Sequence, residues 1–285
     1  MKMKTVLKMA LLVVLIVSLA ACGSKNTLEE VKDQGSATVG FANEKPYAYQ
    51  ESNGELTGEA VEIARVILNK LGVEEMEGEL TEFGSLIGGL QSKRFDMITA
   101  GMFVNPKRCE SVLFADPEYS IGESIGVLTG NPHDIHSYAD IAANPEVKVA
   151  VMVGAVEIGY LEAMEVPADQ IVQVPDQAAA ISALQSDRAQ VITMTGPSLQ
   201  AMLESANDSG IERVMDFEQP IVDGKSVRGY GATAFHNDDA EFRDAFNKEL
   251  KKMKESGELL EILETFGFTE AELPGDMTAE ELCNA

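Results

Sequence analysis

One arginine stands where the chain could bind an anion. Arg108 follows Pro106, which predicts the start of a helix directly after a strand expected at 96–100. A guanidinium group pairs with a carboxylate through two parallel hydrogen bonds, which an ammonium group does not. Backbone N–H groups at a helix start also favour an anion. Arg108 is therefore a candidate carboxylate ligand, and the alternative is a surface arginine paired with an acid such as Glu110.

Three aromatic residues could supply a complementary surface for a cation. Tyr47, Phe83 and Phe103 each follow a predicted strand, where the loops of an α/β sheet emerge. A ring face attracts a cation, and one such contact contributes about 0.5–2 kcal/mol. Each ring taken alone is more simply a core residue. Three rings beside Arg108 favour a shared site over three separate core residues.

Two acids are candidate hydrogen-bond acceptors for such a cation. Glu44 could accept from ligand N–H groups and balance their charge, because an ionised acceptor strengthens these bonds. The alternative is an exposed turn acid beside Lys45. Glu157 falls near the start of a helix predicted over 154–164, where the alternative is an acid stabilised by the helix dipole.

The N-terminus has the features of an export signal. Three lysines precede an apolar run at 9–19, which is too short to span a bilayer and is typical of a secretory signal peptide over residues 1–21. The segment LAAC at 19–22 resembles the lipobox of bacterial lipoproteins. That resemblance implies acylation of Cys22, with 22–27 as a leash at the outer face of the membrane or in the periplasm. The alternative is ordinary cleavage after Ala21.

Composition limits the possible partners. Removal of residues 1–21 takes away three lysines and no acid, which leaves 19 basic and 47 acidic residues and a net charge of −28. Such a field repels a phosphate backbone, so we expect no nucleic-acid partner. His133, His136 and His236 are scattered and no Cys/His cluster exists, so we expect neither a metal nor a cofactor. Cys109 and Cys283 form either a disulfide or two free thiols.

Short β-type runs alternate with helical patterns, which predicts an α/β fold with mostly parallel sheets. The order of elements suggests two lobes, with residues 28–128 and 228–285 in lobe 1 and residues 129–227 in lobe 2. A cleft between two lobes is a natural ligand site, and hinge closure can trap a small solute there.

Three segments resemble the core signature of the polar amino-acid type of ABC-transporter solute-binding proteins: FDMITAGM at 95–102, NPKR at 105–108 and FADPEY at 114–119. The likeness runs over essentially the whole chain after residue 21. Within that family, four segments resemble the ectoine/hydroxyectoine-binding proteins: ANEKPYAY at 42–49, EFGSLI at 82–87, GMFVNPKRC at 101–109 and GAVE at 154–157.

The resemblance implies a type II periplasmic-binding-protein fold, with a mixed, mostly parallel sheet in each lobe and the ligand in the cleft. It implies that Arg108 holds a ligand carboxylate, that Tyr47, Phe83 and Phe103 form an aromatic box, and that Glu157 completes the site on closure. The full set of ligand-binding residues expected is Glu44, Tyr47, Phe83, Gly101, Phe103, Arg108, Val156, Glu157 and Thr195. The expected partners are a small zwitterionic solute, ectoine or hydroxyectoine, and ABC permease subunits, and the expected state is a monomer.

One departure bears on the ligand. Relatives that bind α-amino acids place an aspartate for the ligand ammonium after a strand of the second lobe. Here the strand at 191–194 runs into Thr195-Gly196-Pro197, with no acid. The loss of such a buried partner costs about 2–5 kcal/mol, which argues against a plain amino acid. A binding protein for a polar amino acid or a betaine-like solute, an enzyme on the same scaffold and an extracellular sensor remain as alternatives, with Glu44 or Glu157 as the acid or base of an enzyme.

Overall fold

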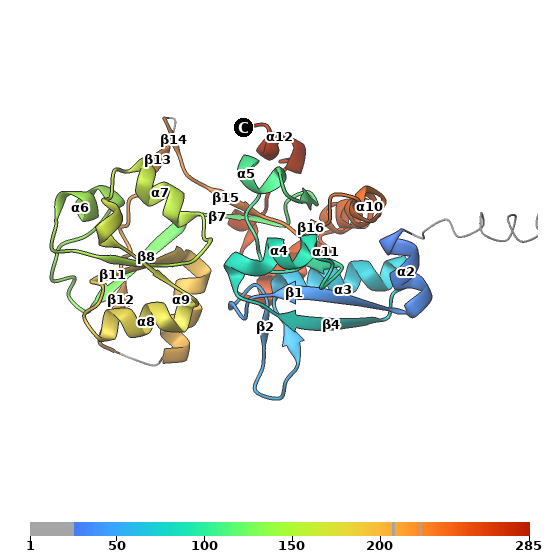
Figure 1. Cartoon of the computed structure of the whole chain (residues 1–285), viewed down its shortest axis with the longest axis horizontal. Coiled ribbons are helices and arrows are strands. Elements are labelled where there is room, and N and C mark those ends of the chain that lie inside the picture. Colours follow the sequence, from blue (N-terminus) through green and yellow to red (C-terminus); the bar gives the residue numbers. More distant parts are fainter. Residues whose placement is uncertain (1–25, 207–208, 223) are drawn as a thin grey trace, which may run out of the picture.

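The computed structural model of the chain describes residues 26–206, 209–222 and 224–285. Two lobes lie side by side, each built on a five-stranded sheet with helices packed against it (Figure 1). The expected signal peptide and the candidate acylation site Cys22 lie outside the described residues. Of the expected leash, residue 27 is already helical, because the Asn26 side chain accepts from the Glu29 N–H and caps the first described helix.

The first lobe has the strand order β4-β1-β5-β16-β6. β1 is parallel to β4 and β5, whereas β16 returns late in the chain and runs antiparallel to β5 and β6. The strands of this sheet are β1 (Ser36–Phe41), β4 (Glu75–Leu80), β5 (Met97–Ile98), β6 (Leu113–Phe114) and β16 (Ala234–Phe235). Its main helices are α2 (Thr27–Gln34), α3 (Glu59–Leu71), α4 (Leu86–Gln91), α10 (Ala240–Ser256) and α11 (Glu258–Thr265).

The core of this lobe forms where the apolar face of α3 meets β1 and α10. Ile63 and Ile67 recur at helical spacing and are fully buried together with Phe246 of α10. Burial of each such side chain stabilises the fold by about 1.5–3 kcal/mol. The strand ends that carry the loops to the cleft are therefore held on a rigid base.

The second lobe has the strand order β10-β9-β11-β8-β12. β9 is parallel to β10 and β11, and β8 runs antiparallel to β11 and β12. The strands are β8 (Glu123–Leu128), β9 (Val149–Met152), β10 (Ile171–Val174), β11 (Val191–Thr195) and β12 (Ile211–Arg213). The helices are α6 (Tyr138–Ala143), α7 (Glu157–Ala163), α8 (Gln177–Gln185) and α9 (Gly196–Ala206).

The first crossing between the lobes falls earlier than the sequence predicted. Residues 123–128, which we expected to end lobe 1, form β8 and pair with β11 in the second sheet. The crossing is carried by β7 (Tyr119–Ile121), which pairs antiparallel with β15 (Gly229–Gly231) on the way back. Figure 1 shows these two connections running side by side between the lobes. Local sequence could not reveal this, because the residues of β11 that pair with β8 lie 64 to 72 residues further along the chain.

Two further elements differ from expectation. The helix predicted over 154–164 begins only at Glu157, because Gly154 has a φ of 80° and starts a turn. The strand predicted over 227–235 is divided into β15, which belongs to the connection, and β16, which belongs to the first sheet. The short pairs β2 (Tyr49–Gln50) with β3 (Leu56–Thr57), and β13 (Ile221–Val222) with β14 (Lys225–Ser226), lie outside the two main sheets.

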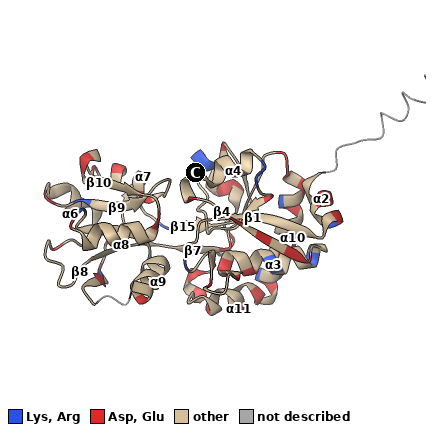
Figure 2. Cartoon of the chain, turned by 60° about the horizontal axis from the view of Figure 1, so that its bottom comes forward, with Lys and Arg blue, Asp and Glu red and all other residues tan. Residues whose placement is uncertain are grey.

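Charged residues occur on the helices of both lobes, and Asp and Glu outnumber Lys and Arg (Figure 2). No described helix combines the length and apolar character that crossing a membrane requires.

The C-terminal segment is joined covalently to the first lobe. Cys283 at the end of α12 (Ala279–Cys283) forms a disulfide with Cys109 at the end of α5 (Pro106–Cys109), with their Cα atoms 5.7 Å apart. The bond links positions separated by 174 residues. It therefore holds the C-terminus against the short helix that carries Arg108.

We expect the double variant C109S/C283S to unfold at a lower denaturant concentration. Loss of the cross-link increases the conformational entropy of the unfolded chain. It should lower the free energy of unfolding by about 2–5 kcal/mol. Chemical denaturation followed by circular dichroism measures this, with wild-type protein under reducing conditions as the matched comparison. Equal midpoints for oxidised wild type and the double variant would show that the disulfide does not form.

Candidate functional site

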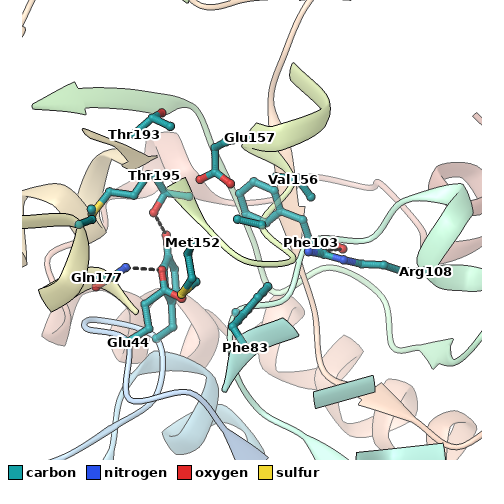
Figure 3. A pocket seen from close by; sticks show the side chains of 15 residues that line it. Glu44, Phe83, Phe103, Arg108, Met152, Val156, Glu157, Gln177, Thr193 and Thr195 are labelled. Carbon is teal, nitrogen blue, oxygen red and sulfur yellow. Dashed lines mark hydrogen bonds between the residues drawn. The ribbon is translucent and has the colours of Figure 1, made fainter. Parts of the chain in front are cut away.

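All nine residues expected to bind the ligand line one cavity between the two lobes (Figure 3). Glu44, Tyr47, Phe83, Gly101, Phe103 and Arg108 come from the first lobe, and Val156, Glu157 and Thr195 from the second. The cavity is also lined by six residues that we did not anticipate: Met152, Ala155, Gln177, Ala180, Thr193 and Met194.

Arg108 reaches the cavity from α5 and contacts both lobes. Its Nη1 donates to the Phe103 carbonyl oxygen at 2.7 Å and its Nη2 donates to the Gly154 carbonyl oxygen at 2.9 Å. The guanidinium carbon lies 5.5 Å from the centre of the Phe83 ring. Burial lowers the pKa of Arg108 to about 10, so it remains a cation at neutral pH. Since a guanidinium group has five N–H donors, these carbonyls leave others for an anion.

The three expected aromatic residues occupy different environments around the cavity. Tyr47 stacks on Tyr119 with ring centres 5.3 Å apart, and its hydroxyl group lies 2.5 Å from that of Thr195 in the other lobe. Phe103 lies against β15, where a Cβ atom on Gly229 would be 1.8 Å from its ring. Only glycine leaves room there. Tyr47 thus belongs both to the core and to the cavity wall. The two interpretations from the sequence, a core residue and a ligand-facing ring, both apply to it.

Glu44 is held from across the cleft. Its Oε1 accepts from Gln177 Nε2 at 2.5 Å and lies 3.1 Å from Ser198 Oγ, and both partners belong to the second lobe. Burial, and then the nearby charge of Glu157, raise the pKa of Glu44 to about 8, against opposing effects of Ser198 and Arg108. Glu44 is therefore buried in the cleft and is not an exposed turn acid.

Glu157 is the first residue of α7, and its side chain is 5% exposed. Burial raises its pKa, while its own backbone N–H, Glu123 and Arg108 oppose that rise. Figure 3 shows Glu157 and Glu44 on one side of the cavity and Arg108 on the other, beyond the Phe103 ring. The cavity thus has a cationic end and an acidic end.

The lobes are in close contact around the cavity. The backbone at Gly84 of the first lobe packs against the backbone at Gly154 of the second. A Cβ atom added to Gly154 would lie 2.7 Å from the Gly84 Cα. The cavity is therefore that of a closed arrangement.

Gln177 and Ser198 were missed in the sequence, although one signal was present. Gln177 follows β10 and begins α8, at the carboxyl end of a parallel strand, where ligand-binding residues gather. Ser198 lies in the first turn of α9, after the same Thr195-Gly196-Pro197 segment that lacks an acid. The Thr195 hydroxyl group bonds to that of Tyr47. The acidic residues that line the cavity are Glu44 and Glu157.

The sequence profile of the bacterial extracellular solute-binding proteins, family 3, matches residues 37–270. The chain belongs to this family, and it has the type II periplasmic-binding-protein fold. A curated relative, the probable amino-acid ABC transporter periplasmic-binding protein y4tE of Sinorhizobium fredii, is 39% identical over 262 residues, which cover 90% of this chain and 86% of the relative.

Two solved structures are also similar. EhuB in complex with hydroxyectoine superposes with a TM-score of 0.83 at 35% identity, over 91% of this chain and 99% of that one. An ancestral arginine-binding protein bound to arginine superposes with a TM-score of 0.71 at 27% identity, over 82% of this chain and 99% of that one.

The raised pKa of Glu44 predicts a pH-dependent cost to stability. In the unfolded chain a glutamate titrates near pH 4.3, whereas Glu44 in the closed structure titrates near pH 8. Between these pH values the folded state binds one more proton than the unfolded state. The free energy of unfolding therefore falls as the pH rises through this window. We expect Glu44→Gln to be increasingly more stable than wild type from about pH 5 to pH 8.

Thermal unfolding of both proteins across this range measures the effect. Glu55→Gln removes an exposed acid and is the control. A difference between Glu44→Gln and wild type that stays constant with pH would contradict the burial of Glu44.

Proposed function

We propose that this chain is the solute-binding component of an ABC importer and that it closes around ectoine or hydroxyectoine. The observation that carries the proposal is the cavity with Arg108 at one end and Glu44 and Glu157 at the other, lined by aromatic rings. The hydroxyectoine complex of EhuB, at 35% identity, supports the same ligand class.

The charges of the cavity suit a compact zwitterion. A ligand carboxylate would take the free donors of Arg108, in the geometry that a guanidinium group prefers. A delocalised amidinium at the other end would donate N–H bonds to the carboxylate of Glu157 and to a carboxyl oxygen of Glu44, and it would face the rings of Phe103 and Tyr47. A molecule of this kind brings one partner for each buried charge.

A polar amino acid is the second candidate. It is favoured by the similarity to the arginine-bound ancestral protein and by the description of y4tE. Against it stands Thr195, which offers a hydroxyl group already bonded to Tyr47. The acids of the cavity, Glu44 and Glu157, line it together with the rings of Tyr47 and Phe103, which a delocalised cation can face.

The remaining parts of the proposal follow from the same class. We propose that residues 1–21 direct export, that Cys22 is acylated, and that the protein works as a monomer with membrane permease subunits. We propose binding without chemical conversion, because Glu44 is engaged by Gln177 and Ser198 and no nucleophile among the described cavity residues adjoins a base.

Isothermal titration calorimetry with ectoine, hydroxyectoine, glycine betaine, arginine and glutamine tests the ligand. We expect a dissociation constant of about 1 μM or below for ectoine or hydroxyectoine and far weaker binding of the others. Arg108→Ala and Phe103→Ala should weaken binding by at least tenfold, because each removes a ligand contact. Arg94→Ala, an exposed arginine paired with Glu79, is the control.

A folded wild-type sample that binds an amino acid, but binds neither ectoine nor hydroxyectoine, would refute this ligand assignment. Recovery of the ligand unchanged after long incubation distinguishes binding from catalysis.

Closure itself can be tested through a glycine. A Cβ on Gly84 would lie 3.1 Å from both Val153 Cγ1 and the Val153 carbonyl oxygen in the opposite lobe. Overpacking of this kind costs about 1–3 kcal/mol, so Gly84→Ala should weaken binding of hydroxyectoine about tenfold. Gly88→Ala is the matched control, since a Cβ there meets nothing within 4 Å. Equal affinities for the two variants in calorimetry would show that the lobes do not meet at Gly84 in the bound state.

A further inference from the structure

Glu123 is a buried acid that does not line the cavity. It begins β8 and its side chain is 2% exposed. Within the described part of the chain, neither of its carboxyl oxygens meets a hydrogen-bond donor. An ionised carboxylate is strongly disfavoured in such a position, because burial removes its water and nothing replaces it. Glu123 therefore needs either a proton or a partner.

The nearest candidate partner is another acid. The carboxyl groups of Glu123 and Glu157 lie within hydrogen-bonding range of each other. Two carboxylates are acceptors only and repel at this range, whereas a carboxylic acid donates to a carboxylate. Because both acids are buried and in contact, one proton shared between them is favoured over two bare carboxylates.

The surroundings decide which residue keeps that proton. Glu157 lies at the start of α7, and both its own backbone N–H and Arg108 favour its ionised form. Burial, Glu157 and then Glu44 all raise the pKa of Glu123. The phenols of Tyr47, Tyr138 and Tyr160 also lie near Glu123, and they supply no positive charge. Glu123 is therefore the protonated member.

The backbone of Glu123 is held firmly in place. Its N–H donates to Gln219 Oε1 at 2.8 Å, and Gln219 Nε2 donates back to its carbonyl oxygen at 2.8 Å. In the antiparallel pair of β8 and β11, Glu123 lies opposite Thr195, a cavity residue. Directly opposed residues of an antiparallel pair share one face of the sheet, so the Glu123 side chain lies on the same face as that of Thr195.

We propose that Glu123 is a positioning residue for the ligand site: a carboxylic acid that stays protonated, donates its hydrogen bond to Glu157 and holds that carboxylate toward the cavity. The inference rests on the proposed function, in which Glu157 accepts from the cationic group of the ligand. The Glu123–Glu157 pair then carries one negative charge and not two. Since burial raises the pKa of Glu44 to about 8, Glu44 is also protonated at neutral pH, and the acidic end of the cavity carries one negative charge. This end is therefore matched to a singly charged cation, as in a zwitterion, in preference to a doubly charged group.

Two substitutions distinguish a neutral donor from a second charge. Glu123→Gln keeps a neutral N–H donor of similar size, and we expect its affinity for hydroxyectoine to stay within about threefold of wild type in calorimetry, whereas Glu123→Ala should lose about 10- to 100-fold. Equal losses in both variants would show that Glu123 acts as an anion. Wild-type affinity in Glu123→Ala would show that Glu157 needs no such support. Either result overturns the proposal.

A measurement without ligand tests the proton directly. Infrared difference spectra of ligand-free wild type against Glu123→Gln should show, between about pH 6 and pH 8, the C=O band of a protonated carboxylic acid that the variant lacks. Absence of that band overturns the proposal even if Glu123→Ala fails to fold. Failure of wild type to bind hydroxyectoine contradicts only the assigned ligand, since the infrared result stands by itself.

Discussion

The cavity removes charges of both signs from water, and each buried charge requires a partner. Arg108 finds carbonyl oxygens in both lobes, one at Phe103 and one at Gly154. Glu44 belongs to the first lobe but accepts from Gln177 of the second. The bonds to Gly154 and from Gln177 exist only while the lobes are together. Closure of the lobes and satisfaction of the buried charges are therefore one event, and a zwitterionic ligand completes it in the proposed function.

The connection between the lobes is shaped by the aromatic residues that pack on it. β15 has glycine at two alternate positions, Gly229 and Gly231, where a Cβ atom would overlap the rings of Phe103 and Tyr119. Tyr119 also donates from its hydroxyl group to the Gly101 carbonyl oxygen at 2.8 Å. The hinge strands, the core and the cavity wall thus share the same side chains. A change in hinge geometry would move the aromatic wall with it.

The helix that carries Arg108 is short, and it is stabilised from outside. The Asn105 side chain accepts from the Arg108 N–H and caps α5, and the disulfide from Cys109 to Cys283 joins its far end to the C-terminal segment. Four residues of helix would be marginal in isolation. The C-terminal segment therefore contributes to the site without approaching the ligand cavity.

Sequence alone determined the features that depend on neighbouring residues. A proline before Arg108, apolar spacing along α3 and aromatic residues after strands are local patterns, and from them and the family likeness came all nine expected cavity residues and the α/β class. Tertiary structure decided what depends on distant partners: that β8 belongs to the second lobe, that Gln177 and Ser198 hold Glu44, and that Glu123 lies against Glu157. The physical reason is that a strand or a buried acid acquires its role through contacts with residues distant in the sequence. Such contacts form only when the chain folds, so a local sequence pattern does not predict them.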